Sequence, residues 1–302
     1  MAGIGFELKK IIDKDNIFAQ ARVYFMSSLI TVGPMIICIT LFLVMQRLLK
    51  NLGASYANIQ IFNAVIIYSF LISYISSNGI SMLMSRYISD CIYTKKSGCI
   101  FESFLGVSII CSIISTIIMS LLLINSPLNL IIKSICFMIT IILSLIWLEI
   151  IYLSAIKEYL HIVSFFLIGI SIVILGTILG IEFLNIPPIY SALLFSLAGY
   201  IFIAISFMVL LYKVFGIKDL RLSNCLKFVC SIDKYYELLL IGLFLSLGAY
   251  FPNILIWLTP NSTLVEETFR IASFYDVPSF YAFLSVIPSV VIPLHRFQIL
   301  LK

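Results

Sequence analysis

KVFGIKDLRLSNCLKFVCSIDKYYE, residues Lys213 to Glu237, is a polar stretch in the middle of an otherwise apolar chain. Six long apolar segments precede it, and at least one more begins directly after it. We therefore interpret this stretch as the linker between two membrane-embedded halves of the protein.

The composition on both sides of this stretch is that of an integral membrane protein. Of the 302 residues, 62% are hydrophobic and 11% are charged, whereas about 25% of the residues of a soluble domain are charged. No segment alternates with the period of two that a transmembrane β-strand requires. The sequence therefore predicts an all-α integral membrane fold, a polytopic helical bundle.

Runs of about 20 apolar residues mark the helices that can cross the hydrocarbon core, which is about 30 Å thick. We expect eight such helices, at about 24–45, 61–84, 103–124, 135–156, 162–181, 189–212, 238–258 and 277–294. They divide the chain into four parts: an N-terminal segment, 1–23; a first six-helix bundle, 24–212; a cytoplasmic linker, 213–237; and the start of a second bundle with two helices, 238–302.

Basic residues predict the orientation, because lysine and arginine concentrate in cytoplasmic loops. With the N-terminus inside, all but Arg47, Lys50, Lys133 and Arg270 of the 19 basic residues lie on the cytoplasmic side. We attribute the net charge of +5 to this topology and not to nucleic-acid binding. In segment 1–23, apolar residues at helical spacing predict an amphipathic surface helix, and a plain basic flank fits equally well.

Cysteines, histidines and known motifs give no sign of catalysis. Cys225 and Cys230 lack a second pair or nearby histidines, so we expect no zinc site. No phosphate-binding glycine loop, Ser-His-Asp set or paired carboxylates are present. We expect no metal, no cofactor and no enzymatic activity.

Glycine and proline interrupt the first helix of each predicted half. Gly33 lies eleven residues after Arg22, and Gly248 lies eleven residues after Glu237; Pro34 and Pro252 follow in the same helices. Paired interruptions of this kind mark a substrate pathway or hinges between halves. The alternative is that glycine and proline are simply common in membrane helices.

Polar residues recur on the second predicted helix. Serines every four residues make one face wettable and could line a substrate cavity, while small residues at this spacing also permit close helix packing. The candidates are Asn63, Ser69, Ser73, Ser77, Asn78 and Ser81.

Glu149 is the clearest acid within a predicted span. An ionisable group at that depth is costly and is treated as functional by default. Arg86, at the end of the second predicted helix, is a candidate partner at similar depth, and Tyr152 lies within reach on the same face. The alternatives are ion coupling or substrate contact on one side, and a structural ion pair or an interfacial side chain on the other.

The opening Met1-Ala-Gly-Ile-Gly-Phe-Glu-Leu-Lys-Lys-Ile11, Gly33-Pro34 and Tyr275-Asp-Val-Pro278 resemble the PelG family of Pel exopolysaccharide transporters. The resemblance implies a flippase-like fold of two six-helix bundles, related to the multidrug/oligosaccharidyl-lipid/polysaccharide superfamily. It implies a hexosamine-rich polysaccharide cargo. It also implies a cytoplasmic glycosyltransferase and cyclic di-GMP-regulated membrane subunits as partners. The family offers no binding motif that can be carried over to single residues.

This chain has only about two predicted spans after the linker, where members of that family continue. We therefore expect a shortened or partial copy whose independent transport needs another chain to complete it. The sequence predicts a component of exopolysaccharide export in the bacterial cytoplasmic membrane, with its N-terminus in the cytoplasm. The alternatives are a flippase for lipid-linked oligosaccharides and a non-transporting scaffold that docks a cytoplasmic glycosyltransferase.

Overall fold

The computed structural model describes residues 38, 40–94, 98–156, 159–216, 225–272, 274–276, 278–279 and 282. Within them lie six helices that are long and apolar enough to cross a membrane. These helices are α3 (Tyr56–Asn78), α5 (Gly98–Leu123), α6 (Leu130–Ile156), α7 (Tyr159–Glu182), α8 (Pro188–Phe215) and α10 (Cys230–Trp257). The predicted all-α, multi-pass membrane fold is confirmed.

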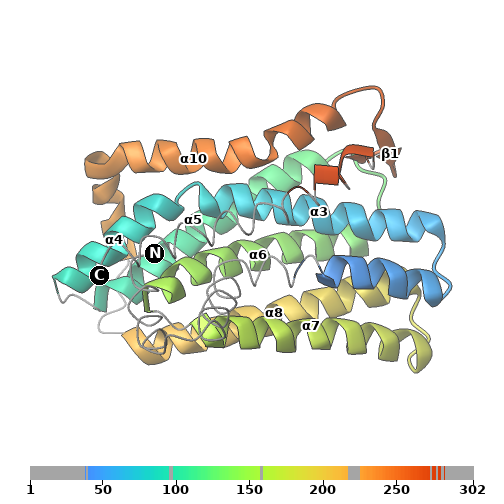
Figure 1. Cartoon of the computed structure of the whole chain (residues 1–302), viewed down its shortest axis with the longest axis horizontal. Coiled ribbons are helices and arrows are strands. Elements are labelled where there is room, and N and C mark those ends of the chain that lie inside the picture. Colours follow the sequence, from blue (N-terminus) through green and yellow to red (C-terminus); the bar gives the residue numbers. More distant parts are fainter. Residues whose placement is uncertain are drawn as a thin grey trace, which may run out of the picture.

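The long helices lie roughly parallel and form a bundle (Figure 1). Helix α6 is central, because it packs against α3, α5 and α8, whereas α10 packs against α3 and the shorter helix α4 (Ser81–Tyr93). A helical segment at 40–51 precedes α3. We call the end of the bundle where α4 finishes the α4 end, and the opposite end the hairpin end.

A two-stranded antiparallel hairpin covers part of the hairpin end. Its strands are β1 (Thr263–Val265) and β2 (Phe269–Ile271), with Leu264 opposite Arg270. The 3-10 turn η1 (Lys227–Val229) leads into α10 at the α4 end. The hairpin was not predicted from the sequence, because strands of only three residues are too short to show an alternating pattern.

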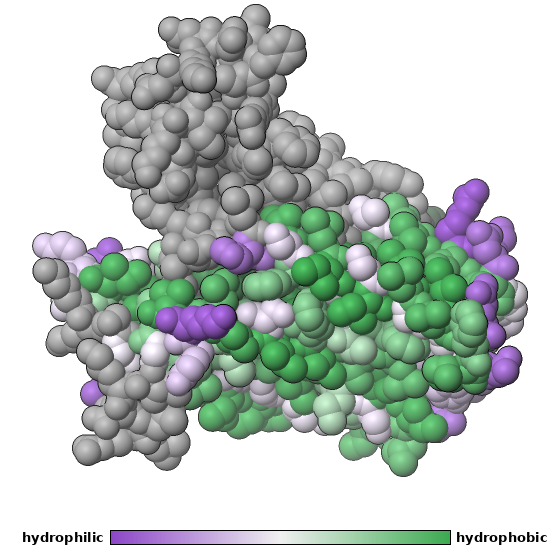
Figure 2. Space-filling model, turned by 90° about the horizontal axis from the view of Figure 1, so that it is seen from below, coloured by the Kyte–Doolittle hydropathy of each residue, from purple (hydrophilic) through white to green (hydrophobic). Residues whose placement is uncertain are grey.

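Apolar side chains cover the outside of the bundle. On α5, Ile109, Ile113, Ile117 and Leu121 recur every four residues and are between 54% and 71% exposed. Figure 2 shows a broad apolar surface on one face, with hydrophilic residues gathered mainly toward its ends. In water such a surface would be unfavourable, so it is suited to contact with lipid.

Local sequence signals explain several helix ends. The side chain of Ser55 caps α3 by accepting a hydrogen bond from the backbone N–H of Asn58 at 3.3 Å. Pro188 occupies the first turn of α8, where a missing N–H costs nothing. Gly216 ends α8 with a φ of 62°, a conformation that favours glycine.

The largest differences from the predicted helix boundaries occur at three places. The first predicted helix extends to residue 51 instead of 45, the predicted span 61–84 breaks at Gly79 into α3 and α4, and α10 begins at Cys230 instead of 238. Polar residues at a helix end do not stop the helix once it leaves the hydrocarbon region, so hydropathy alone makes the predicted helices too short. Most of the predicted spans 24–45 and 277–294 lies outside the described residues. The division into two bundles stays a prediction.

Candidate functional site

The candidate site is the seam where α10 packs against α3 and α4. Of α10, only Gly242, Ser246 and Trp257 are buried, while most of its apolar side chains remain exposed. Helix α10 is therefore held through a narrow strip. We call this strip the α10 seam, formed by Tyr68, Tyr74, Gly79 and Asp90 on one side and Tyr235, Gly242, Tyr250 and Trp257 on the other.

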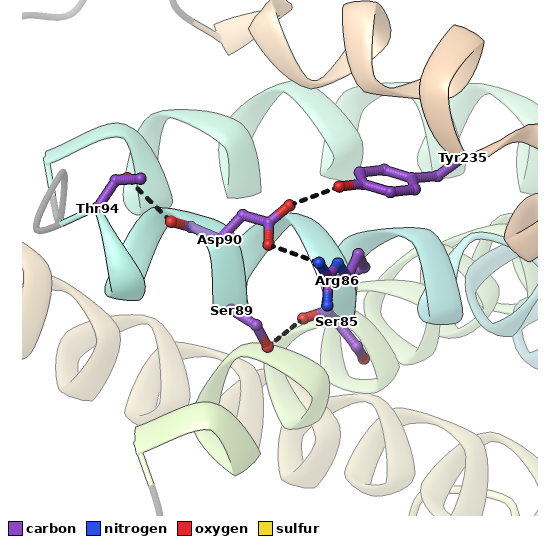
Figure 3. A network of polar contacts seen from close by, with 6 residues as sticks. All are labelled: Ser85, Arg86, Ser89, Asp90, Thr94 and Tyr235. Carbon is purple, nitrogen blue, oxygen red and sulfur yellow. Dashed lines mark hydrogen bonds and ion pairs between the residues drawn. The ribbon is translucent and has the colours of Figure 1, made fainter.

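A polar network closes the seam at the α4 end (Figure 3). Tyr235 donates its hydroxyl hydrogen bond to Asp90 Oδ2 at 3.0 Å, and Arg86 forms an ion pair with Asp90 Oδ1 at 3.3 Å. The guanidinium carbon of Arg86 lies 5.6 Å from the centroid of the Tyr235 ring. Contact with Tyr235 and then the charge of Asp90 raise the pKa of Arg86.

Tyr235 is also where the backbone of α10 departs from helical geometry. Its φ of −129° and ψ of 34° interrupt the helix five residues after it begins at Cys230. The sequence predicted the interruption at Gly248 and Pro252, but α10 continues through both. The irregular turn thus coincides with the residue that anchors α10 to α4.

Removing the Tyr235 hydroxyl should loosen this end of α10. The hydrogen bond is to a charged group, but the side chains of Asp90 and Arg86 are 40% and 54% exposed, so water weakens it. We therefore expect Tyr235→Phe to lower the free energy of local opening of this end of α10 by about 1 kcal/mol, which raises the opening equilibrium constant about fivefold. Hydrogen exchange of the first turns of α10 should quicken accordingly. Tyr236→Phe, at a neighbouring ring that is 56% exposed, is the control and should change nothing. Equal exchange in the two variants would contradict the anchoring role.

The middle of the seam is a close crossing of two backbones. A Cβ atom placed on Gly242 would lie 2.5 Å from the carbonyl oxygen of Gly79, and one placed on Gly79 would lie 2.6 Å from Leu243 Cδ2. A side chain at Gly242 would therefore meet backbone, whereas one at Gly79 would require the end of the Leu243 side chain to move aside. Because Gly79 also ends α3, the crossing lies where the predicted second helix breaks.

Aromatic rings from four helices form a row beside this crossing. The ring centroid of Tyr74 lies 5.2 Å from Tyr250 and 6.0 Å from Trp147, and Phe70 lies 5.9 Å from Trp147 and 6.0 Å from Tyr200. All four pairs meet edge to face, a favourable arrangement. We call these five residues the aromatic row.

A second network closes the seam at the hairpin end. Tyr68 stacks on Trp257 with centroids 4.7 Å apart, and its hydroxyl donates to the carbonyl oxygen of Arg270 at 2.9 Å. Asp276 accepts hydrogen bonds from Trp257 Nε1 at 3.0 Å and from Asn253 Nδ2 at 3.2 Å. Asp276 thereby ties the segment after the hairpin to α10.

The predicted serine face packs against α6. Ser69, Ser73 and Ser77 are fully buried. Ser77 donates to the carbonyl oxygen of Ser144 at 2.9 Å, and Ser73 accepts from Trp147 Nε1 at 3.2 Å. These contacts fit the close-packing alternative in this conformation, and a role in a substrate pathway stays a prediction.

The other pathway candidates are not gathered at one place. Gly33 and Pro34 lie outside the described residues. Asn63 has a buried side-chain oxygen without a hydrogen-bond partner among the described residues, and the carbonyl oxygen of Asn78 accepts from the Ser81 hydroxyl at 2.7 Å. A Cβ atom on Gly248 would meet nothing within 4 Å, so that glycine does not mark a close approach within the described part of the chain.

Glu149 and Arg86 are not partners, contrary to our interpretation of the sequence. Arg86 pairs with Asp90, four residues along α4, and Tyr152 pairs its hydroxyl with Ser103 at 3.0 Å. Glu149 is fully buried, and among the described residues neither carboxyl oxygen has a hydrogen-bond partner. The spacing along one helix could not reveal that α10 supplies the partner of the α4 charges.

Most residues of the seam were not predicted from the sequence. Asp90 could have been found from its i,i+4 spacing to Arg86. Asp276 belongs to Tyr275–Pro278, a stretch used only for its resemblance. Tyr235, Tyr68 and Trp257 carry no local signal, because their partners are distant in the chain.

The two cysteines near the start of α10 should differ in reactivity. Burial of the Cys225 thiol and then the charge of Glu102 raise its pKa, whereas Cys230 is exposed. At pH 7.5 we expect maleimide to modify Cys230 at least about tenfold faster, since the thiolate is the reactive form. Raising the pH to 9 should narrow the difference between the two modification rates. Peptide mapping of the wild type and of Cys230→Ser measures both rates, and faster modification of Cys225 would be inconsistent with this geometry.

Within the described residues, no group of three or more His, Cys, Asp or Glu side chains is arranged to hold a metal ion. The bundle and its seam are those of a polytopic helical membrane protein. A family model described as "PelG: Putative exopolysaccharide Exporter (EPS-E)" matches residues 1–299, and the chain belongs to this family. Comparison with curated proteins and with solved structures gave no match.

Proposed function

We propose that this protein is a transport component that exports an exopolysaccharide across the bacterial cytoplasmic membrane. The observation that carries the proposal is the PelG family match, which extends over residues 1–299 and so includes both sides of the α10 seam. The proposed mechanism is flippase-like, by alternating access or as a conduit, with α10 moving against α3 and α4. The proposed cargo is a Pel-like, hexosamine-rich polymer.

The aromatic row supports a carbohydrate cargo. A sugar ring presents an apolar C–H face, and rigid aromatic side chains offer such a face a large contact area. Phe70, Tyr74, Trp147 and Tyr250 are only partly buried, and Tyr74 and Tyr250 belong to opposite sides of the seam. Separation of α10 from α3 would therefore expose ring faces along the path of the polymer.

We propose that the α4 end faces the cytoplasm. The connections that join helices at this end carry Lys95, Lys96, Lys157, Lys218 and Arg221 in the sequence, and such loops favour the cytoplasmic side. A cytoplasmic glycosyltransferase and cyclic di-GMP-regulated membrane subunits would meet the protein here. The Arg86–Asp90–Tyr235 network would then close the cytoplasmic side of the seam.

Glu149 is the residue that we propose for energy coupling. A charged carboxylate in apolar surroundings is costly unless it is paired, and both of its oxygens lack partners among the described residues. A proton satisfies a carboxylate without further ligands, whereas a hard metal cation requires several oxygens. Glu149 would carry a proton in this conformation and release it when the seam opens.

Transport of a labelled hexosamine oligosaccharide into proteoliposomes tests the proposal. We expect uptake by the wild type and a large loss in Tyr74→Ala/Tyr250→Ala, with Tyr56→Ala, at a ring that is 74% exposed, as the control. Movement of only lipid-linked oligosaccharides would support a lipid-linked flippase instead. Binding of a glycosyltransferase without movement of any glycan would support a scaffold.

A further inference from the structure

A pocket at the hairpin end lies away from the α10 seam. Its volume is about 350 Å³, and it lies between the helical segment 40–51 and the end of α7. Arg47 and Asn51 face it from the first element, and Glu182 faces it from the second. Val44, Leu48 and Ile178 provide apolar walls.

The two charges in this pocket do not neutralise each other. Within the described residues, Arg47 and Glu182 form no ion pair within 4.0 Å, and Asn51 makes no side-chain hydrogen bond. Arg47 and Asn51 are four residues apart and so lie on one helix face. The pocket therefore presents a cation and an amide on one wall and an anion on the other, with space between them.

The helix faces that continue from the pocket are apolar. Leu43 lies four residues before Arg47, and Leu175 and Leu179 lie three residues before Ile178 and Glu182. These leucines are 44%, 60% and 51% exposed, respectively. A ligand whose polar group entered the pocket would thus lay an apolar tail against these residues. This combination of separated charges above an apolar surface suits an amphiphile at a membrane interface.

We propose that this pocket binds a phospholipid whose head group carries both a phosphate and a primary ammonium group. Arg47 and Asn51 donate hydrogen bonds to the phosphate, and the Glu182 carboxylate accepts hydrogen bonds from the ammonium. The acyl chains lie along Leu43, Leu175 and Leu179. The inference concerns the bilayer around the protein and does not depend on the exported cargo.

Binding of individual lipids to the purified full chain, measured by native mass spectrometry, tests this inference. Phosphatidylethanolamine should bind about tenfold more tightly than phosphatidylcholine, which cannot donate a hydrogen bond to Glu182, or phosphatidylglycerol, which lacks the cation. Glu182→Gln should remove this preference, whereas Arg47→Gln, which loses the contact with the phosphate that all three lipids share, should weaken the binding of all three about tenfold. The controls Lys50→Gln and Glu266→Gln change charges that do not line the pocket and should retain the wild-type preference and affinity.

The melting temperature of every variant is compared with that of the wild type, so that only folded variants are scored. Unchanged preference in Glu182→Gln or unchanged lipid affinity in Arg47→Gln would overturn the proposal, and so would equal losses in the two controls. A third arm uses free phosphoethanolamine. Binding of this soluble compound as tightly as the lipid would assign the pocket to a water-soluble ligand and would overturn the lipid proposal.

Discussion

Replacement of Glu149 by leucine is expected to give a protein that is more stable than the wild type and no longer exports. Leucine has a similar volume and removes two buried oxygens that have no hydrogen-bond partner among the described residues. Burying such polar atoms costs about 1–3 kcal/mol in proteins, so the free energy of unfolding should rise by a similar amount. A stabilising substitution that destroys activity is typical of a functional site.

Two measurements check this result. Thermal unfolding in nanodiscs should give a melting temperature a few degrees higher, and glycan export in proteoliposomes under a pH gradient should fall to background. Glu149→Asp, which retains the acid, should retain part of the export. If Glu149→Leu unfolded at a lower temperature and still exported at the wild-type rate, both the burial argument and the coupling role would fail.

Glu102 provides the matched control for stability. It is also buried, with 2% of its surface exposed, but unlike Glu149 it is not without an interaction partner. Its replacement by leucine removes that interaction and should lower the melting temperature. Changes in melting temperature of opposite sign at the two buried glutamates would distinguish an unpartnered acid from a structural one.

Hydropathy predicted the spans well because the lipid-facing requirement is local. Each of α5, α6, α7 and α8 needs about 20 apolar residues, whatever its neighbours are. The break at Gly79 could not be found in this way, since Ile80 and Met82 keep the segment apolar. The break coincides with a tertiary contact, the close crossing of Gly79 and Gly242, which hydropathy does not reveal.

The site was less predictable than the fold for the same reason. Glu149 could be found from one helix, because a buried charge is costly wherever it lies. The partner of Asp90 could not, since Tyr235 lies 145 residues away in sequence. Repeating serines were ambiguous, because small hydroxyl residues suit both a wet face and a tight helix contact.

The two glycines of α10 should respond in opposite ways to the addition of one methyl group. In Gly242→Ala the new Cβ would meet the carbonyl oxygen of Gly79 at 2.5 Å, and backbone cannot move aside as a side-chain end can. Overpacking of this kind costs about 1–3 kcal/mol. In Gly248→Ala the methyl meets nothing within 4 Å, and alanine is better than glycine in a helix by about 1 kcal/mol.

The measurement is thermal unfolding and glycan export of both variants in the same lipid. Gly242→Ala should melt several degrees lower and lose most of its export, because α10 can no longer approach α3 and the rings of Tyr74 and Tyr250 are forced apart. Gly248→Ala should melt at the same temperature or slightly higher. The sequence favoured Gly248 as the hinge, so the comparison also separates two hypotheses. Loss of export in Gly248→Ala at full stability would support a hinge at Gly248. Loss of export only in Gly242→Ala would make the crossing with Gly79 the point about which α10 must close.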